Sequence, residues 1–204
     1  MRFVAQIRRA VRHPDEILPA IVCMFTRFQV KRVVQDGKVF HAYKGALYPD
    51  TITHGNAASH VLETAKQYCC GAGIDIGANQ WPFPGAIPID DNSGENAYAL
   101  DQIADGSLDY VFSSHCLEHL ARWQDALRLW IGKLKPGGIL FLYLPHESCA
   151  LWRPGAPWVG GAHKWSPTWQ VLAPFLESCG MTVVDYNAGR DDYWSFHIIA
   201  RRRP

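Results

Sequence analysis

Three apolar stretches decide the fold: GIDIGANQWPFPGAIPIDD at residues 73–91, ADGSLDYVFSSHCLEHL at residues 104–120 and LKPGGILFLYLPHE at residues 134–147. Each holds a short apolar run that ends in polar or turn-forming residues, which is typical of a buried strand. The run from Ile139 to Leu144 is wholly apolar, as expected for the middle of a parallel sheet. We therefore expect strands that are buried along their length and carry polar residues at their carboxyl ends.

Helical patterns alternate with these strands. Apolar residues recur at helical spacing from Cys116 to Leu134, ahead of a Lys-Pro-Gly-Gly stop, and a second helix is expected from Thr168 to Cys179. Alternation of strands and helices predicts an open α/β sheet with right-handed crossovers. The expected strands are Gly73–Ile76, Gly85–Asp90, Leu108–Ser114, Ile139–Leu144, Met181–Tyr186 and Ser195–Arg201.

The first 60 residues (1–60) are expected to form a helical, basic extension to a domain over residues 61–204. Residues 1–44 carry nine Lys or Arg against three acids, a formal charge of +6. Such a segment either makes a weak peripheral contact with an anionic membrane surface or is simply a solvated face, and we favour the second. The elements expected are helices over Phe3–Val11, Ile17–Val33 and Ala57–Tyr68, a turn at Gln35–Lys38, a strand at Val39–Tyr43 and a loop over residues 45–56.

The composition is that of an ordinary globular protein, with 48% hydrophobic and 19% charged residues. The longest apolar run, Ile17 to Phe25, is interrupted by Pro19 and is far shorter than the roughly 20 residues a membrane-spanning helix needs. The six cysteines form no C-x-x-C pair. Without a secretory signal they indicate reduced thiols, so we expect a cytoplasmic protein.

Polar groups follow several of the expected strands, and ligands of open α/β sheets bind at those carboxyl ends. Gly77 lets the backbone turn and approach a ligand closely. Asp90 ends the second strand, where an acid can accept hydrogen bonds from ribose hydroxyls. The chain has no G-x-G-x-x-G loop to bind a pyrophosphate. These residues therefore indicate a nucleoside ligand without phosphates.

The three quoted stretches resemble the class I S-adenosylmethionine-dependent methyltransferases, and within them the compact bacterial form of the type 11 branch. The D-G-S-L-D-Y-V-F-S-S-H-C-L-E-H run and the later L-K-P-G-G are the specific parts, and the resemblance covers about residues 70–200. It implies S-adenosylmethionine as cofactor and methyl transfer as activity. It also implies an α/β fold: a Rossmann-like open sheet, mostly parallel with an antiparallel last strand, and with helices on both faces.

The resemblance assigns the first cofactor loop to the methionine part of the cofactor. Asp75 would orient the methionine amino group, and Gly77 would give the backbone room beside it. Asn79 stands where the family has a second glycine, and Trp81 where it has a third. The helix that the family has between the first two strands is nearly gone. Asn tolerates the left-handed backbone better than most residues, so Asn79 can take the glycine's place.

The remaining cofactor contacts implied by the resemblance follow the second and third strands. Asp90 would hold the ribose hydroxyls, and Asp101 and Gln102 would lie near the adenine. Ser114 and His115 would lie beside the methionine end and the sulfonium. No metal ligand is expected in this interpretation.

Methyl transfer to a hydroxyl needs a base that takes the proton. Imidazole suits that task because it titrates near neutral pH. We expect His115 or His146 to be the catalytic residue, since each follows a strand and faces the expected cleft. The loop from Glu147 to Trp165 is rich in Trp and Gly and is the expected acceptor pocket. Relatives of this compact type suggest a small-molecule or saccharide acceptor.

Three alternatives stay open. His115, Glu118 and His119 match H-x-x-E-H, a zinc-peptidase signature that needs a helical setting and a third ligand downstream. The altered glycine loop would also suit a non-catalytic binding module with a Rossmann-like fold. Methylation of nucleic acid is the third, but basic residues are not interleaved with aromatics here, and no nucleic-acid partner is expected. The sequence leaves the oligomeric state undecided.

Overall fold

The computed structural model describes residues 21, 22, 25, 27–90 and 96–204. Its centre is a six-stranded sheet in the order β5-β4-β6-β7-β9-β8. The strands of this sheet are β4 (Gly73–Ile76), β5 (Ile87–Ile89), β6 (Leu108–Ser114), β7 (Leu134–Pro145), β8 (Met181–Tyr186) and β9 (Ser195–Arg202). The helices are α3 (Leu62–Tyr68), α4 (Trp123–Lys133) and α5 (Trp169–Ser178), with 3-10 turns η2 (Arg27–Gln29), η3 (Asp50–Thr53), η4 (Ala57–His60) and η5 (Leu117–His119).

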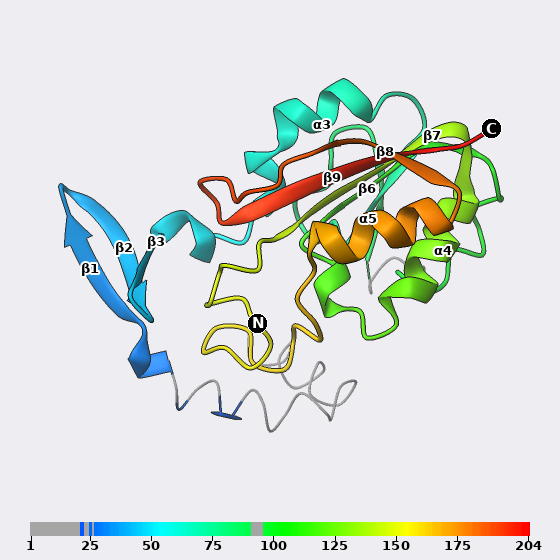
Figure 1. Ribbon diagram of the computed structural model, residues 1–204. Coiled ribbons are helices and arrows are strands. Elements are labelled where there is room, and N and C mark those ends of the chain that lie inside the picture. The colour runs from blue at the N-terminus through cyan, green and yellow to red at the C-terminus, as the bar shows by residue number, and fades with distance from the viewer. Residues whose placement is uncertain (1–20, 23–24, 26, 91–95) are drawn as a thin grey trace.

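The pairing of these strands confirms the predicted fold class. β5, β4, β6 and β7 run parallel, whereas β9 pairs antiparallel with both β7 and β8. Helix α3 covers one face of the sheet and helices α4 and α5 cover the other (Figure 1). The fold is a Rossmann-like open sheet whose last strand is inserted antiparallel between β7 and β8.

The two faces of the sheet have different chemistry because side chains alternate along each strand. On β7, Leu140, Leu142 and Leu144 face α4 and α5 and join an aliphatic core. Phe141 and Tyr143 of the same strand face the opposite side and join an aromatic core. Aromatic rings from the loops after β7 and before β9 complete that second core, so both faces of β7 are buried.

No helix connects β4 to β5: residues 77–86 are all described, and none of them is helical. Ten residues make this parallel crossover, which usually takes a dozen or more. Phe83 takes over the packing that a helix would supply, since its ring lies 4.8 Å from Phe112 and 5.7 Å from Tyr110. The near absence of this helix, expected from the sequence, is therefore confirmed.

The helix predicted from Ile17 to Val33 is wrong at its carboxyl end. Lys31–Gln35 forms β1, which pairs with β2 (Lys38–Tyr43) and through it with β3 (Ala46–Pro49) in a small antiparallel sheet. The expected turn is correct: Asp36 and Gly37 both have positive φ, 50° and 74°, which matches the twist of a two-residue hairpin.

This hairpin overrides the weak helical pattern before it, because β-branched Val33 and Val34 pair well across strands. β3 and η3 also replace most of the loop predicted over residues 45–56. The helix predicted at Phe3–Val11 lies outside the described residues, as does the first part of Ile17–Val33.

The predicted helix from Cys116 to Leu134 is divided in two. Only η5 and α4 are helical, and residues 120–122 between them are not. The break leaves Trp165 room to donate its Nε1 hydrogen to the carbonyl of Leu117, 3.0 Å away. The predicted strands over Leu108–Ser114 and Met181–Tyr186 are confirmed at both ends.

Within the described part of the chain, no helix has the length and hydropathy that crossing a membrane requires. The cysteines described there are all free thiols.

The contact between Gly73 and Tyr110 yields a stability prediction. A Cβ on Gly73 would lie 2.4–2.5 Å from atoms of the Tyr110 ring, which is only 2% exposed and cannot move away. We expect Gly73→Ala to lower the free energy of unfolding by about 1–3 kcal/mol, the usual cost of overpacking. Urea unfolding followed by circular dichroism measures it.

Gly132 in α4 is the matched control, because a Cβ there meets no atom within 4 Å. Gly132→Ala should be neutral or stabilising by up to about 1 kcal/mol, since Ala is the better helix former. Equal effects of the two substitutions would contradict the packing described for β4.

Candidate functional site

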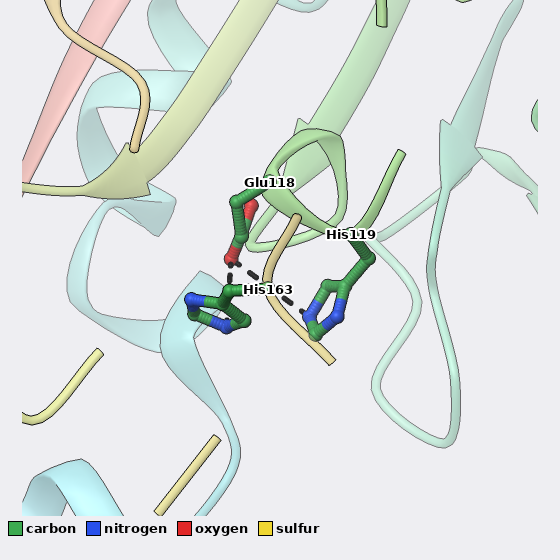
Figure 2. Close-up of side chains that lie close together, drawn as sticks. All are labelled: Glu118, His119 and His163. Carbon is green, nitrogen blue, oxygen red and sulfur yellow. Dashed lines mark ion pairs between the residues drawn. The ribbon is translucent and has the colours of Figure 1, made fainter. Parts of the chain in front are cut away.

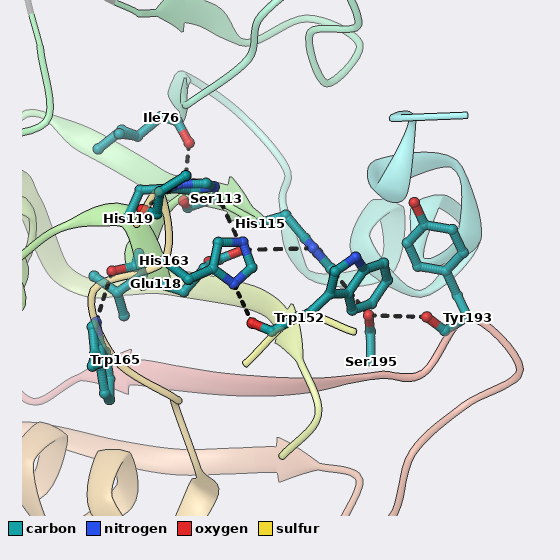
Figure 3. Close-up of polar contacts among 12 residues, drawn as sticks. Ile76, Ser113, His115, Glu118, His119, Trp152, His163, Trp165, Tyr193 and Ser195 are labelled. Carbon is teal, nitrogen blue, oxygen red and sulfur yellow. Dashed lines mark hydrogen bonds and ion pairs between the residues drawn. The ribbon is translucent and has the colours of Figure 1, made fainter. Parts of the chain in front are cut away.

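The carboxyl ends of β4, β5 and β6 meet at one edge of the sheet. Ile76 is in register with Ile89 of β5 and with Ser113 of β6, so the residues that follow are neighbours. The hydroxyl of Ser113 donates to the carbonyl of Ile76 at 2.9 Å and ties β6 to β4 at this point (Figure 3). The structure therefore brings Gly77 and Ser114 together, as the sequence predicts.

Gly77 sits where no other residue fits. Its φ is 84°, and a Cβ there would lie 2.5 Å from Cβ of Cys116. Asn79 has a φ of 48°, which confirms the left-handed backbone expected where the family has its second glycine. The loop after β4 therefore keeps the turned backbone that glycines usually provide.

Ser114 carries the polar atom that most directly indicates a ligand at this edge. Its Oγ is buried and has no hydrogen-bond partner among the described residues. Buried hydroxyls are normally paired, so an unpaired one beside a left-handed glycine loop fits a polar ligand group. This is the observation by which the edge fits the amino-acid end of S-adenosylmethionine.

Asp75 has a partner inside the protein. Its side chain is on the aromatic face of the sheet, is 2% exposed, and accepts the N–H of Phe83 at 2.8 Å through Oδ2. Burial raises the pKa of this carboxyl to about 7, against the opposing effect of the Phe83 hydrogen bond. In this structure the carboxyl of Asp75 holds the loop that leads to Phe83, a contact that sequence alone did not indicate.

The other expected cofactor residues lie around the same edge. Asp90 directly follows β5 and is half-buried, on the strand that neighbours β4. Asp101 and Gln102 are exposed in a turn before β6. Asp75 thus lies within β4 and Asp90 directly after the neighbouring β5, but Asp75 is buried and only Asp90 is partly open to solvent.

His115 directly follows β6, at the sheet edge where β4, β5 and β6 end, and its side chain contacts residues of the protein interior. Its backbone is left-handed, with a φ of 49°, and its Nε2 lies 2.8 Å from the hydroxyl of Ser195 at the start of β9 (Figure 3). Burial, assisted by the neighbouring His163 and His119, lowers the pKa of His115 well below its usual value. Ser195 is 80 residues away in sequence, so no sequence signal could have predicted this contact.

A second polar centre lies behind His115. The carboxylate of Glu118 is fully buried, and its Oε1 lies 3.8 Å from Nε2 of His163 and 4.0 Å from Nε2 of His119 (Figure 2). Burial raises the pKa of Glu118 to about 8 and lowers that of His163 to about 3. His163, which the sequence placed in the acceptor loop, is thus an interior residue and not part of an open pocket.

The zinc-peptidase setting predicted as an alternative is not present. η5 spans only Leu117–His119, so His115 precedes the helical turn and does not share a helix face with His119. Glu118 is also buried too completely to activate a water molecule as a peptidase base would.

His146 lies at the end of β7, next to the cofactor edge. It lines a small surface pocket together with Pro145, Glu147, Cys149, Trp152, Arg153, Ser166 and Pro167. The hydroxyl of Ser148 lies 2.8 Å from Nδ1 of His146. The free space in this pocket is only about 10 Å³, room for roughly one water molecule, so an acceptor group needs the lining side chains to move apart. Trp165 is not part of it, because that ring stacks on Trp123.

Comparison with known families agrees with this geometry. A family model described as "Methyltransferase domain", type 11, matches residues 52–142, which include β4, β5, β6 and the first part of β7. Residues 52–142 therefore match a methyltransferase domain, in agreement with the resemblance seen in the sequence. The methyltransferase is an enzyme that uses S-adenosylmethionine as its cofactor.

Solved structures share the fold of this methyltransferase at low sequence identity. An S-adenosylmethionine-dependent methyltransferase from Mesorhizobium loti is 15% identical, with a TM-score of 0.54 over 73% of this chain and 99% of its own. One from Thermotoga maritima is 12% identical, with a TM-score of 0.57 over 74% and 92%. The [4+2]-cyclase SpnF is 15% identical, with a TM-score of 0.55 over 73% and 82%. The cyclase shows that this fold alone does not decide the reaction. No curated protein matches the sequence.

Asp75 yields a pH-dependence prediction. Between about pH 4 and pH 7 the folded protein keeps a proton on Asp75 that the unfolded chain has lost, because the folded pKa is about 7. This group therefore stabilises the fold less as pH rises through that window. Asp75→Asn cannot ionise and can still accept the N–H of Phe83. We therefore compare the free energy of unfolding of Asp75→Asn with that of the wild type at each pH. This difference should be about 2–3 kcal/mol more favourable to the variant at roughly pH 7.5 than at pH 4.5.

Asp109→Asn is the control for that measurement. Asp109 accepts a hydrogen bond from Lys135, which lowers the pKa of that carboxyl below its ordinary value. Its difference from the wild type should stay constant over the same interval, since Asp109 is ionised in both states. Urea unfolding at several pH values measures both variants, and a pH-independent difference for Asp75→Asn would contradict the buried carboxyl.

Proposed function

We propose that the enzyme transfers the methyl group of S-adenosylmethionine to a hydroxyl oxygen of a small-molecule or saccharide acceptor. The observation that carries the proposal is the adjacency of two features at one sheet edge. The unpaired hydroxyl of Ser114 and the turned loop at Gly77 follow β6 and β4, and the pocket at His146 follows β7, which pairs with β6.

The residues at the first feature would hold the cofactor. Gly77 and Asn79 turn the backbone beside the methionine portion, and Ser114 offers its unpaired hydroxyl to the amino-acid end. Asp90 would accept hydrogen bonds from the ribose hydroxyls, and the turn at Asp101 and Gln102 would lie near the adenine. When bound, S-adenosylmethionine supplies a methyl group that is already strongly electrophilic. The protein then has to align the acceptor and exclude water.

His146 is the better of the two histidines as the base for the acceptor proton. It lines the pocket, whereas Nε2 of His115 is engaged by Ser195 and its Nδ1 faces Glu118 at 3.6 Å. We therefore assign proton removal to His146, and to His115 the positioning of the β6 end against β9. Arg153 in the same pocket adds a positive charge suited to an anionic acceptor such as a nucleotide sugar.

The N-terminal segment would be an extension docked on the catalytic domain. We propose the division at residues 1–60 and 61–204, with the extension contributing Tyr43, Tyr48 and Ile52 to the aromatic core. Exposed Phe25 and Phe28 lie beside basic Arg27 and Lys31, a combination suited to a weak contact with an anionic membrane surface. We place the enzyme in the cytoplasm.

Cofactor binding tests the first half of this proposal. Asp90→Ala should weaken binding of S-adenosylmethionine and S-adenosylhomocysteine by about 10- to 150-fold, the loss of a charge-assisted hydrogen bond of about 1.5–3 kcal/mol. Isothermal titration calorimetry measures both ligands. Asp125→Ala, on the exposed face of α4 between Arg122 and Arg128, is the control and should bind normally.

An unchanged affinity in Asp90→Ala would mean that another residue holds the ribose. No binding by the wild-type protein would contradict the cofactor assignment and support a non-catalytic module.

Acceptor chemistry tests the second half. Formation of S-adenosylhomocysteine is measured with a panel of nucleotide sugars, oligosaccharides and small hydroxyl compounds. With the best acceptor, His146→Gln should lower kcat by about 10²- to 10⁴-fold, the usual contribution of a general base, and leave cofactor affinity unchanged. His54→Gln, on an exposed turn, is the matched control. A kcat that survives in His146→Gln would show that another group takes the proton.

A further inference from the structure

A buried carboxylate faces three imidazoles and hydrogen-bonds to none of them. Oε1 of Glu118 lies 3.6 Å from Nδ1 of His115, 4.0 Å from Nε2 of His119 and 3.8 Å from Nε2 of His163. The side chain of Glu118 is 0% exposed, and neither of its oxygens has a hydrogen-bond partner in another residue. Leaving a carboxylate in this state is costly, so the site requires a group that the four side chains share.

In each imidazole, the hydrogen bond made by the nitrogen that points away from Glu118 determines whether the nitrogen that faces Glu118 carries a hydrogen or a lone pair. Nδ1 of His163 lies 2.5 Å from the carbonyl oxygen of Trp152, and Nδ1 of His119 lies 3.0 Å from that of Ala162 (Figure 3). A carbonyl only accepts, so Nδ1 carries the hydrogen in both rings, and Nε2 of the neutral ring presents a lone pair to Glu118. Two lone pairs and a carboxylate therefore converge on one point.

In His115 the two nitrogens exchange roles, because Nε2 contacts a hydroxyl and Nδ1 faces Glu118. Nε2 of His115 lies 2.8 Å from the hydroxyl of Ser195, and when that hydroxyl donates to the carbonyl of Tyr193, 3.4 Å away, it accepts the Nε2 hydrogen of His115. Nδ1 of His115 then also turns a lone pair toward Glu118. Metal-binding histidines usually donate from one ring nitrogen to a carbonyl or another acceptor and ligate through the other nitrogen.

We propose that Glu118, His119 and His163 bind one divalent transition-metal ion of the zinc class. Their ligating atoms all lie within 4.8 Å of one another (Figure 2). Ligands about 2.0–2.1 Å from a tetrahedral ion are separated by about 3.3 Å, so a small inward shift of the side chains completes the site. Two imidazoles and a carboxylate favour zinc, cobalt or nickel over magnesium, which prefers oxygen ligands.

The surroundings fit such an ion. His119 is partly exposed, with 38% of its side chain accessible, and gives a path from solvent, whereas Glu118 and His163 form the buried floor. Three protein ligands leave a fourth position, on the side where Nδ1 of His115 faces the same oxygen. The ion would join η5 to the loop at Ala162–His163, and so fasten that loop to the end of β6.

A carboxylate on the surface also lies near two histidines, but unlike Glu118 it is exposed and hydrogen-bonded. Asp50 is 42% exposed and pairs directly with Nε2 of His41 at 2.8 Å and with Nε2 of His54 at 3.4 Å. Its charge is already satisfied by hydrogen bonds and water. His54→Gln therefore removes a surface histidine beside a carboxylate without touching the proposed site, and it serves as the matched control.

The test uses the full-length protein, freed of any affinity tag and treated with a chelator. Zn²⁺ is added at one equivalent and in excess, and the melting temperature and bound metal are measured. Co²⁺ is used as the spectroscopic probe, because its visible absorption reports the coordination number. We expect one ion per chain, a four-coordinate Co²⁺ spectrum and a melting temperature raised by roughly 5 °C or more.

The ligand variants complete the test. Glu118→Gln has the same shape without the charge and should lower Zn²⁺ affinity on the order of 100-fold or more, as should His163→Gln. His119→Gln changes a partly exposed side chain, so it keeps the test valid if a buried variant fails to fold. His54→Gln should bind Zn²⁺ like the wild type.

A folded wild-type protein that takes up neither Zn²⁺ nor Co²⁺ would overturn the proposal. So would binding that survives in His119→Gln and Glu118→Gln but is lost in His54→Gln, because the ion would then occupy the surface pair. None of these measurements involves S-adenosylmethionine, so they stand apart from the test of methyl transfer.

Discussion

The parallel pairing of β4 with β5 on one side and with β6 on the other is the constraint on which the site depends. Because all three strands run in the same direction, whatever follows each of them reaches the same edge of the sheet. The register then sets which residues meet. Ile76 lies opposite both Ile89 and Ser113, so Gly77 and Ser114 are neighbours although 37 positions separate them. A shift by one residue would turn the polar groups away from this edge and the apolar ones out of the core.

The short connection between β4 and β5 leaves part of the sheet without a covering helix, and other parts of the chain cover it instead. Without a helix there, the aromatic face of the sheet needs other cover, and Phe83 supplies part of it. Asp75 fixes Phe83 by accepting its N–H, which explains a buried carboxyl in the middle of an apolar strand. Tyr43 and Tyr48 cover the same face, so residues before the matched segment 52–142 share its core.

Two polar centres lie on either side of His115. On one side, Ser114 has a buried, unpaired hydroxyl beside the loop after β4, and on the other Glu118 has a buried, unpaired carboxyl among histidines. The left-handed backbone of His115 makes this division possible, because it turns the chain sharply between β6 and η5. A ligand at the first centre and an ion at the second would both stabilise the same turn, since each satisfies a buried polar atom.

For the six-stranded sheet, the sequence by itself determined the order of the strands, their parallel pairing and the edge at which polar residues gather, since alternating apolar runs and short turn signals are local properties. It also indicated the left-handed backbone at Asn79, because few residues tolerate that conformation. Only the tertiary structure decided which polar groups are paired. Ser195 reaches His115 and His163 reaches Glu118 across 80 and 45 positions, and no local pattern encodes such contacts. Burial then decides whether a carboxyl such as Asp75 or Glu118 is exposed to water or held inside the protein, and so what chemistry it can perform.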